Sequence, residues 1–206
     1  MTSQTGDRPV SRADLAAMWF FIVAGVAIVG ATLYAAIVRV VEGLSGGPVH
    51  VPATFSGTTA QAPIGPGGEM RDVELQTAVL TTDGLSTAGR IALVLEQVVA
   101  VASVSLLVVC LVLVTISVMR GRVFGKRNTG LVGLAGIAAL GGIAGVPFFG
   151  NMVANDAFRA ISDGTYDNVT MSVHVSTLIL AAFIFSLAAT VFTVGDRLQR
   201  ETDLLV

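Results

Sequence analysis

One acidic side chain is the first candidate for chemistry, because Glu96 is flanked by long apolar sequence. A charge at the centre of a bilayer costs at least about 2.5–3.5 kcal/mol, so an intramembrane carboxylate is a functional-site candidate by default. His174 and Arg39 each lie at the expected outer end of an apolar run, where both could approach Glu96 in an outer vestibule. Three interpretations are open: Glu96 stays solvated among the headgroups, pairs structurally with Arg90 or Arg39, or carries a proton or a ligand.

The other reactive residue types form no recognisable catalytic or metal-binding set. His50 and His174 lie far apart in the sequence and belong to no HxxH or HExxH arrangement. Cys110 is the only cysteine, which excludes CxxC chemistry and an intramolecular disulfide. There is no G-x-S-x-G elbow, and no glycine-rich phosphate loop follows a strand. We therefore expect a non-enzymatic protein without a metal or cofactor.

A short basic segment lies between the second and third apolar runs. Its notable residues are Arg120, Arg122, Phe124, Lys126, Arg127 and Asn128. The segment is too short to be a nucleic-acid domain, so we expect no direct contact with nucleic acid. Its charges can fix the orientation of the chain and attract anionic lipid, each charge contributing about 1 kcal/mol. The alternative is a docking surface for a cytoplasmic partner.

Four apolar runs must position these residues, and the predicted spans cover about residues 15–41, 91–119, 129–150 and 171–195. Each has the roughly 20 apolar residues that a helix needs to cross a hydrocarbon core about 30 Å thick. Only 13% of the residues are charged, against about 25% in soluble domains. The prediction is an all-α membrane protein, a four-transmembrane-helix bundle in which residues 1–206 form a single integral membrane domain in the lipid bilayer. The first run exceeds the 7–15 residues typical of a signal peptide, so we expect it to be retained.

The distribution of basic residues predicts the orientation. Eight cations fall on one side of the predicted spans: Arg8, Arg12, Arg120, Arg122, Lys126, Arg127, Arg197 and Arg200. The opposite side carries fewer cations and most of the acids. The positive-inside rule therefore places both termini and the basic segment in the cytoplasm of a multi-pass protein of the cell membrane.

The long segment between the first two spans, residues 43–86, should be extracytoplasmic. Residues 49–55 and 73–79 alternate with the period of a strand and are separated by a Gly/Pro-rich turn, which predicts a small β-hairpin. An isolated hairpin is marginal in water, so it should pack on the helix ends or gain a third strand. Ser86 is the expected N-cap of the second long helix.

The third span is rich in glycine. Gly130, Ala138, Gly141 and Gly145 fall within one quadrant of a helix, and the last two have the small-xxx-small spacing that lets helices approach closely. Two interpretations are open. This face can mediate homo-oligomer formation, or the third span can be the most crowded helix of its own bundle.

Two segments resemble a known family. The stretch GRVFGKRNTGLVGLAGIAALGG at residues 121–142 is similar to a basic-aromatic G-x-x-F-x-x-x-N turn, and the C-terminal FSLAATVFTVGDRLQRETDLLV is similar to that family's ending. The family consists of small four-span bacterial membrane proteins of unknown function. By position, its recurring residues would be Phe124, Asn128, Glu201, Asp203 and Val206. The resemblance implies a gene often found beside a small helix-turn-helix regulator, and no known catalytic activity.

Two hypotheses for function follow. The first is a sensing or regulatory protein that acts on a cytoplasmic partner through the basic segment and the C-terminal tail. The second is a small transporter or immunity-type protein that binds a solute or peptide between its helices. The second needs a polar interior, for which the available residues are Glu96, Gln97, Ser103, Ser105, Asn151 and Asn155.

Overall fold

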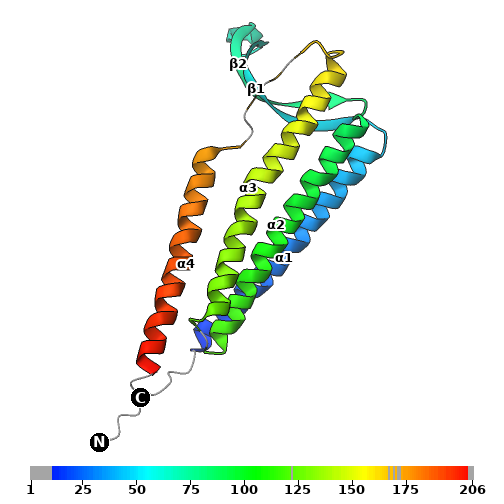
Figure 1. The fold of residues 1–206 in the computed structure, drawn as a ribbon. Helices are drawn as coiled ribbons and strands as arrows, with labels where there is room; N and C mark the ends of the chain where they lie inside the picture. Colours follow the sequence, from blue (N-terminus) through cyan, green and yellow to red (C-terminus); the bar gives the residue numbers. More distant parts are fainter. Residues whose placement is uncertain (1–10, 122, 167, 169, 171–172, 204–206) are drawn as a thin grey trace, which may run out of the picture.

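The computed structural model of the chain describes residues 11–121, 123–166, 168, 170 and 173–203 (Figure 1). Four long helices and one hairpin make up the fold. In chain order the elements are α1 (Arg12–Leu44), β1 (Val49–Ala62), the short 3-10 turn η1 (Pro66–Gly68), β2 (Arg71–Thr82), α2 (Thr87–Met119), α3 (Lys126–Ile161) and α4 (Val175–Asp203).

All four helices are long and apolar enough to cross a membrane. Their apolar side chains point outward, since at most 22% of the residues in the most apolar stretch of any helix are buried inside the protein. A helix that is apolar all round and lacks protein cover is suited to a lipid environment. The predicted architecture of four apolar helices with one small hairpin is confirmed, and it indicates a multi-pass membrane protein.

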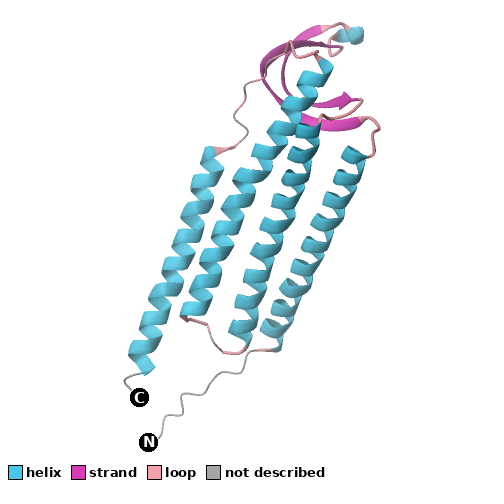
Figure 2. Cartoon of the chain, turned by 45° about the vertical axis from the view of Figure 1, so that its right-hand side comes forward, coloured by secondary structure: helices cyan, strands magenta, loops and turns pink. Residues whose placement is uncertain are grey.

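The helices lie side by side in sequence order (Figures 1 and 2). α2 packs against α1 and, most extensively, against α3, while the main contacts of α4 are with α3. The predicted bundle is therefore an open row, with α2 and α3 inside it and α1 and α4 at its edges. Because side chains at opposite edges cannot meet, this order limits which predicted site residues come together.

α3 is the most crowded helix of the row. A Cβ atom at Gly145 would lie 2.8 Å from Val99 Cγ1 of α2, and one at Gly136 would lie 2.8 Å from Phe185 Cβ of α4. Glycines thus let α3 approach both neighbours, which confirms the interpretation of a crowded central helix. Gly130 and Gly141 are different, because a Cβ atom there would meet nothing within 4 Å. Oligomer formation through that open face stays a prediction.

The two glycines of the small-xxx-small motif should therefore respond differently to substitution. We expect Gly145→Val to lower the free energy of unfolding by about 1–3 kcal/mol, because added atoms overpack the contact with Val99. Gly141→Val is the matched control and should leave the monomer nearly unchanged. Denaturant unfolding of both variants in detergent measures the difference. Equal losses would show that the contact between Gly145 and Val99 does not limit the packing of α3 on α2.

α3 is also the longest helix, with 36 residues. At 1.5 Å per residue it is about 54 Å long, so it extends well beyond a hydrocarbon core about 30 Å thick. A proline inside a helix removes one backbone hydrogen bond, yet α3 continues through Pro147 to Ile161. Neighbouring helices allow a transmembrane helix to tolerate proline, and the residues beyond Pro147 gain contacts under the hairpin.

The hairpin packs on the ends of α2 and α3 that are predicted to be extracytoplasmic, which we call their outer ends. This packing is one of the two predicted possibilities. β1 and β2 pair antiparallel from Val49 opposite Thr82 to Ala62 opposite Arg71, with an irregularity between Thr54 and Thr58. The first half of β1 is buried in a small core. This core contains Val49, Val51, Ala53, Leu85, Ala92, Leu93, Val153, Ala154, Ala157 and Phe158.

The segment after α3 fastens the irregular part of β1. Tyr166 packs on Phe158 with ring centroids 5.1 Å apart, and its hydroxyl lies 2.8 Å from Thr58 Oγ1. Asn168 Nδ2 donates a hydrogen bond of 2.8 Å to the carbonyl of Thr54. We call the hairpin, the outer ends of α2 and α3 and residues 162–168 the outer head, of which Asp167 lies outside the described residues. Contacts between distant segments make it a single packed unit.

Candidate functional site

Glu96 lies near the outer boundary of the predicted membrane region. It precedes Met119, the last residue of α2, by about 34 Å at a helical rise of 1.5 Å per residue. A hydrocarbon core about 30 Å thick measured from that end stops just short of Glu96. The carboxylate is half-buried. This depth suits a group that reaches the headgroups while packing against protein.

The surroundings of Glu96 come from three elements. A Cβ atom at Gly150 of α3 would lie 3.3 Å from Glu96 Oε1, so the carboxylate packs against the α3 backbone. Arg39 of α1 and the side-chain amide of Gln97 lie close enough to influence the charge of Glu96 electrostatically. Arg39 Nη1 also donates a 2.7 Å hydrogen bond to the carbonyl of His50 in β1. The ion pairs of the described residues, with N···O within 4.0 Å, do not include Glu96.

Of the residues predicted to form the outer vestibule, Arg39 lies close enough to act on the charge of Glu96 but forms no ion pair with it within 4.0 Å. Arg90, the other cation considered, is exposed. His174 is also exposed and immediately precedes α4, which lies beyond α3 at the edge of the row (Figure 1). The chain order of the helices separates His174 from α1, so the structure does not place it with Arg39.

Substitution of Glu96 tests whether its charge supports the fold. We expect Glu96→Gln and Glu96→Leu each to change the free energy of unfolding by less than about 1 kcal/mol, because a carboxylate at the level of the headgroups without a close ion pair contributes little. Unfolding in detergent gives the value for both variants. A loss of several kcal/mol in both would instead indicate a buried, paired charge.

A second polar cluster at the outer end joins α2 to α3. Ser86 is the N-cap of α2, as predicted, and its hydroxyl accepts a hydrogen bond from Gly89 N at 3.2 Å. The carboxylate of Asp156 accepts hydrogen bonds from Ser86 N at 2.8 Å and from Ser86 Oγ at 2.5 Å. Any side chain at Gly89 would overlap this carboxylate. Asp156 thus caps α2 from a neighbouring helix, which is a structural role.

The basic segment at the opposite end divides into inward and outward residues. The Phe124 ring packs edge-on against Phe192 of α4, with centroids 5.9 Å apart, and a Cβ atom at Gly195 would overlap it. Asn128 is buried, and its Nδ2 donates a 2.9 Å hydrogen bond to the carbonyl of Val123. These contacts explain why a turn of this shape needs phenylalanine and asparagine. Both residues therefore make structural contacts within the protein, and their part in docking a partner stays a prediction.

The charged residues of the same segment point outward. Arg120, Lys126 and Arg127 are exposed, while Arg122 lies outside the described residues. At this end of the molecule the ion pairs among the described residues lie within α4 instead, joining Arg197 to Glu201 at 3.0 Å and Arg200 to Asp196 at 2.9 Å. The exposed basic charges of the turn are therefore available to an external anion or an acidic partner.

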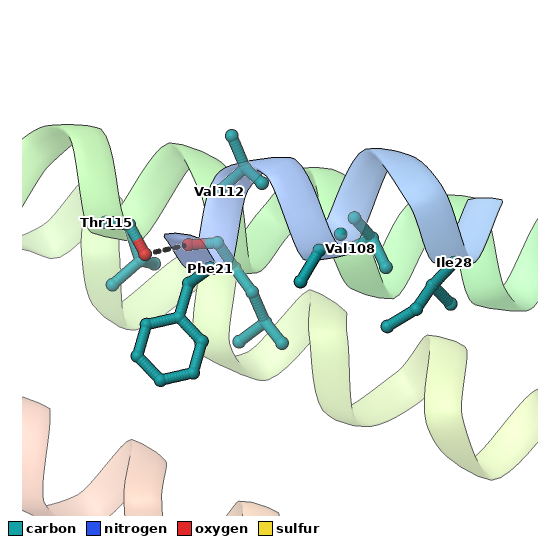
Figure 3. A pocket seen from close by; sticks show the side chains of 9 residues that line it. Phe21, Ile28, Val108, Val112 and Thr115 are labelled. Atoms are coloured by element: carbon teal, nitrogen blue, oxygen red, sulfur yellow. Dashed lines mark hydrogen bonds between the residues drawn. The ribbon is translucent and has the colours of Figure 1, made fainter. Parts of the chain in front are cut away.

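Apolar hollows lie along the sides of the row. One of about 360 Å³ lies between α1 and α2 and is shown in Figure 3, where Phe21, Ile28, Val108 and Val112 surround it. Its one hydroxyl belongs to Thr115 and bonds within α2 to the carbonyl of Leu111 at 2.9 Å. This hollow can accept a hydrocarbon chain and offers little to a polar solute.

Comparison with known proteins gave no match. No family model, no curated protein and no solved structure matched the chain. The resemblance to small four-span bacterial membrane proteins stays a prediction. We therefore infer the function from the two ends of the molecule and from the helices that join them.

Proposed function

We propose that this is a non-enzymatic integral membrane protein that senses conditions at its outer head and regulates a cytoplasmic partner protein. The observation that carries the proposal is the continuity of α3. Its outer end, including Phe158, lies in the core of the outer head, and its first residue, Lys126, belongs to the basic turn. One uninterrupted helix thus joins the outer head to the exposed cations at the far end.

Packing around α3 supports transmission along it. Phe124 packs the basic turn against α4 at Gly195. A shift of α3 relative to α4 must therefore move the turn or the charged residues next to it. α4 then continues to Asp203 as a helix with exposed ion pairs. The turn and this extension lie at the same end of the molecule (Figure 1), which we call the basic end. The positive-inside rule favours a cytoplasmic position for it.

The partner suggested by the family resemblance is a small cytoplasmic regulator. An acidic surface on such a protein would complement Arg120, Lys126 and Arg127, which are exposed. Rim charges of this kind chiefly set the rate and specificity of association. The alternative of a transporter has less support, because the hollow of Figure 3 is apolar.

Site-specific photocrosslinking in cells tests this proposal. A photoreactive amino acid at Lys126 or Arg127 should capture a discrete soluble protein. The matched control is the same amino acid at the exposed Ser56 of the outer head, which should not capture that protein. The proposal would be overturned if the only adducts formed at both basic-end positions were with lipid or with the protein itself.

A further inference from the structure

The seam between α2 and α3 contains a hollow that begins one helical turn below Glu96. Its volume is about 490 Å³, and its lining is apolar except for Ser103. The Ser103 hydroxyl donates a 3.1 Å hydrogen bond to the carbonyl of Ala100 within its own helix, so it is satisfied without a ligand. The volume lies in the range of about 300–1,000 Å³ that is typical of sites for small ligands.

The position of this hollow relative to Glu96 follows from helix periodicity. Glu96, Ala100, Ser103 and Leu107 share one face of α2, because they are spaced by four, three and four residues. On α3, Gly150 contacts the Glu96 carboxylate, and Val146 lines the hollow one turn below it. The hollow thus extends between α2 and α3 from just below Glu96 toward the middle of the helices.

We propose that this seam binds a zwitterionic phospholipid of the outer leaflet, with its ammonium group at Glu96, its phosphate at Arg39 and one acyl chain in the hollow. The hollow spans Ala100 to Leu107 on α2, which is about 10 Å at 1.5 Å per residue. That length fits within one leaflet of a hydrocarbon core about 30 Å thick.

Charge complementarity selects the headgroup. Arg39 bonds to the His50 carbonyl through Nη1, and a guanidinium has five N–H donors, so others are available to a phosphate oxygen. Glu96 can accept hydrogen bonds from a primary ammonium group. A purely anionic headgroup would satisfy Arg39 and be repelled by Glu96. The pair therefore favours phosphatidylethanolamine over phosphatidylglycerol.

This site is independent of the cytoplasmic partner, and lipid titration of the purified full chain tests it directly. Native mass spectrometry in detergent would count bound dioleoyl-phosphatidylethanolamine and dioleoyl-phosphatidylglycerol, which have the same chains. We expect the dissociation constant of the ethanolamine lipid to be at least tenfold lower than that of the glycerol lipid. This ratio corresponds to about 1.4 kcal/mol of binding free energy. Glu96→Gln should abolish this preference. Equal affinities in the wild-type protein would overturn the proposal.

Filling the hollow provides the second arm of the experiment. Ala100→Phe should block the hollow and weaken binding of the ethanolamine lipid at least tenfold. Ala102→Phe is the matched control, because Ala102 lines a different hollow between α1 and α2. If Ala100→Phe elutes as an aggregate in size-exclusion chromatography, Val146→Phe can be used instead, because it fills the same hollow from α3. Equal lipid binding by the hollow-filling variant and the Ala102→Phe control would also overturn the proposal.

Discussion

Asp156→Ala is expected to lower the free energy of unfolding by about 2–3 kcal/mol, because hydrogen bonds to a charged group contribute more than neutral ones. The substitution removes the acceptor of both Ser86 N and Ser86 Oγ at the start of α2. Loss of a helix cap alone costs about 1 kcal/mol. The substitution should also weaken the packing of the outer head, because Leu85 and Phe158 are adjacent to this cluster and belong to the core of the head. Denaturant unfolding in detergent gives the value.

Two variants make the Asp156 experiment specific. Asp83→Ala removes an exposed carboxylate from the turn just before α2 and should change stability by less than about 0.5 kcal/mol. Asp156→Asn keeps one acceptor oxygen and should lose less stability than Asp156→Ala. A loss for Asp156→Ala that is no larger than that for Asp83→Ala would show that the cap does not hold α2 to α3.

Gly195→Leu is expected to displace Phe124 from α4 and to release the basic turn. Every side chain at this position overlaps the Phe124 ring, and the leucine cannot be accommodated without moving the turn. Overpacking of this kind costs about 1–3 kcal/mol. The clearest readout is limited proteolysis in detergent, where trypsin should cut after Lys126 or Arg127 several-fold faster than in the wild-type protein.

Gly130→Leu is the control for this prediction, because a Cβ atom at Gly130 meets nothing within 4 Å. It introduces the same side chain near the same end of α3 without a clash. Phe124→Ala should reproduce the faster cleavage by removing the ring itself. If Gly195→Leu and Gly130→Leu are cleaved at the same rate, then Phe124 does not secure the turn.

The sequence predicts those features that depend on local pattern. Apolar runs longer than a bilayer is thick define the four helices, and strand-period alternation defines the hairpin. Ser86 was recognisable as an N-cap because capping depends on residues within one turn of the helix. The helices are longer than the predicted spans. The length of an apolar run predicts the segment inside the membrane but not how far the helix continues beyond it.

Features that depend on contacts between distant segments could not be predicted. Asp156 and Ser86 are 70 positions apart, and no local signal links them. The separation of His174 from Arg39 follows from the open order of the helices, which hydropathy does not encode. The sequence shows the basic segment as a cluster of charges, but the inward positions of Phe124 and Asn128 depend on α4 and on the Val123 carbonyl.

The measurement that tests the account most directly is accessibility at the two ends of α3. Ser56→Cys in the outer head and Arg127→Cys in the basic turn are exposed positions, whereas the native Cys110 is 1% exposed and provides the background. A membrane-impermeant maleimide should label Ser56→Cys in intact cells and Arg127→Cys only after the membrane is permeabilised. Labelling of Arg127→Cys in intact cells, with Ser56→Cys protected, would contradict a sensor that faces outward and acts on a cytoplasmic partner.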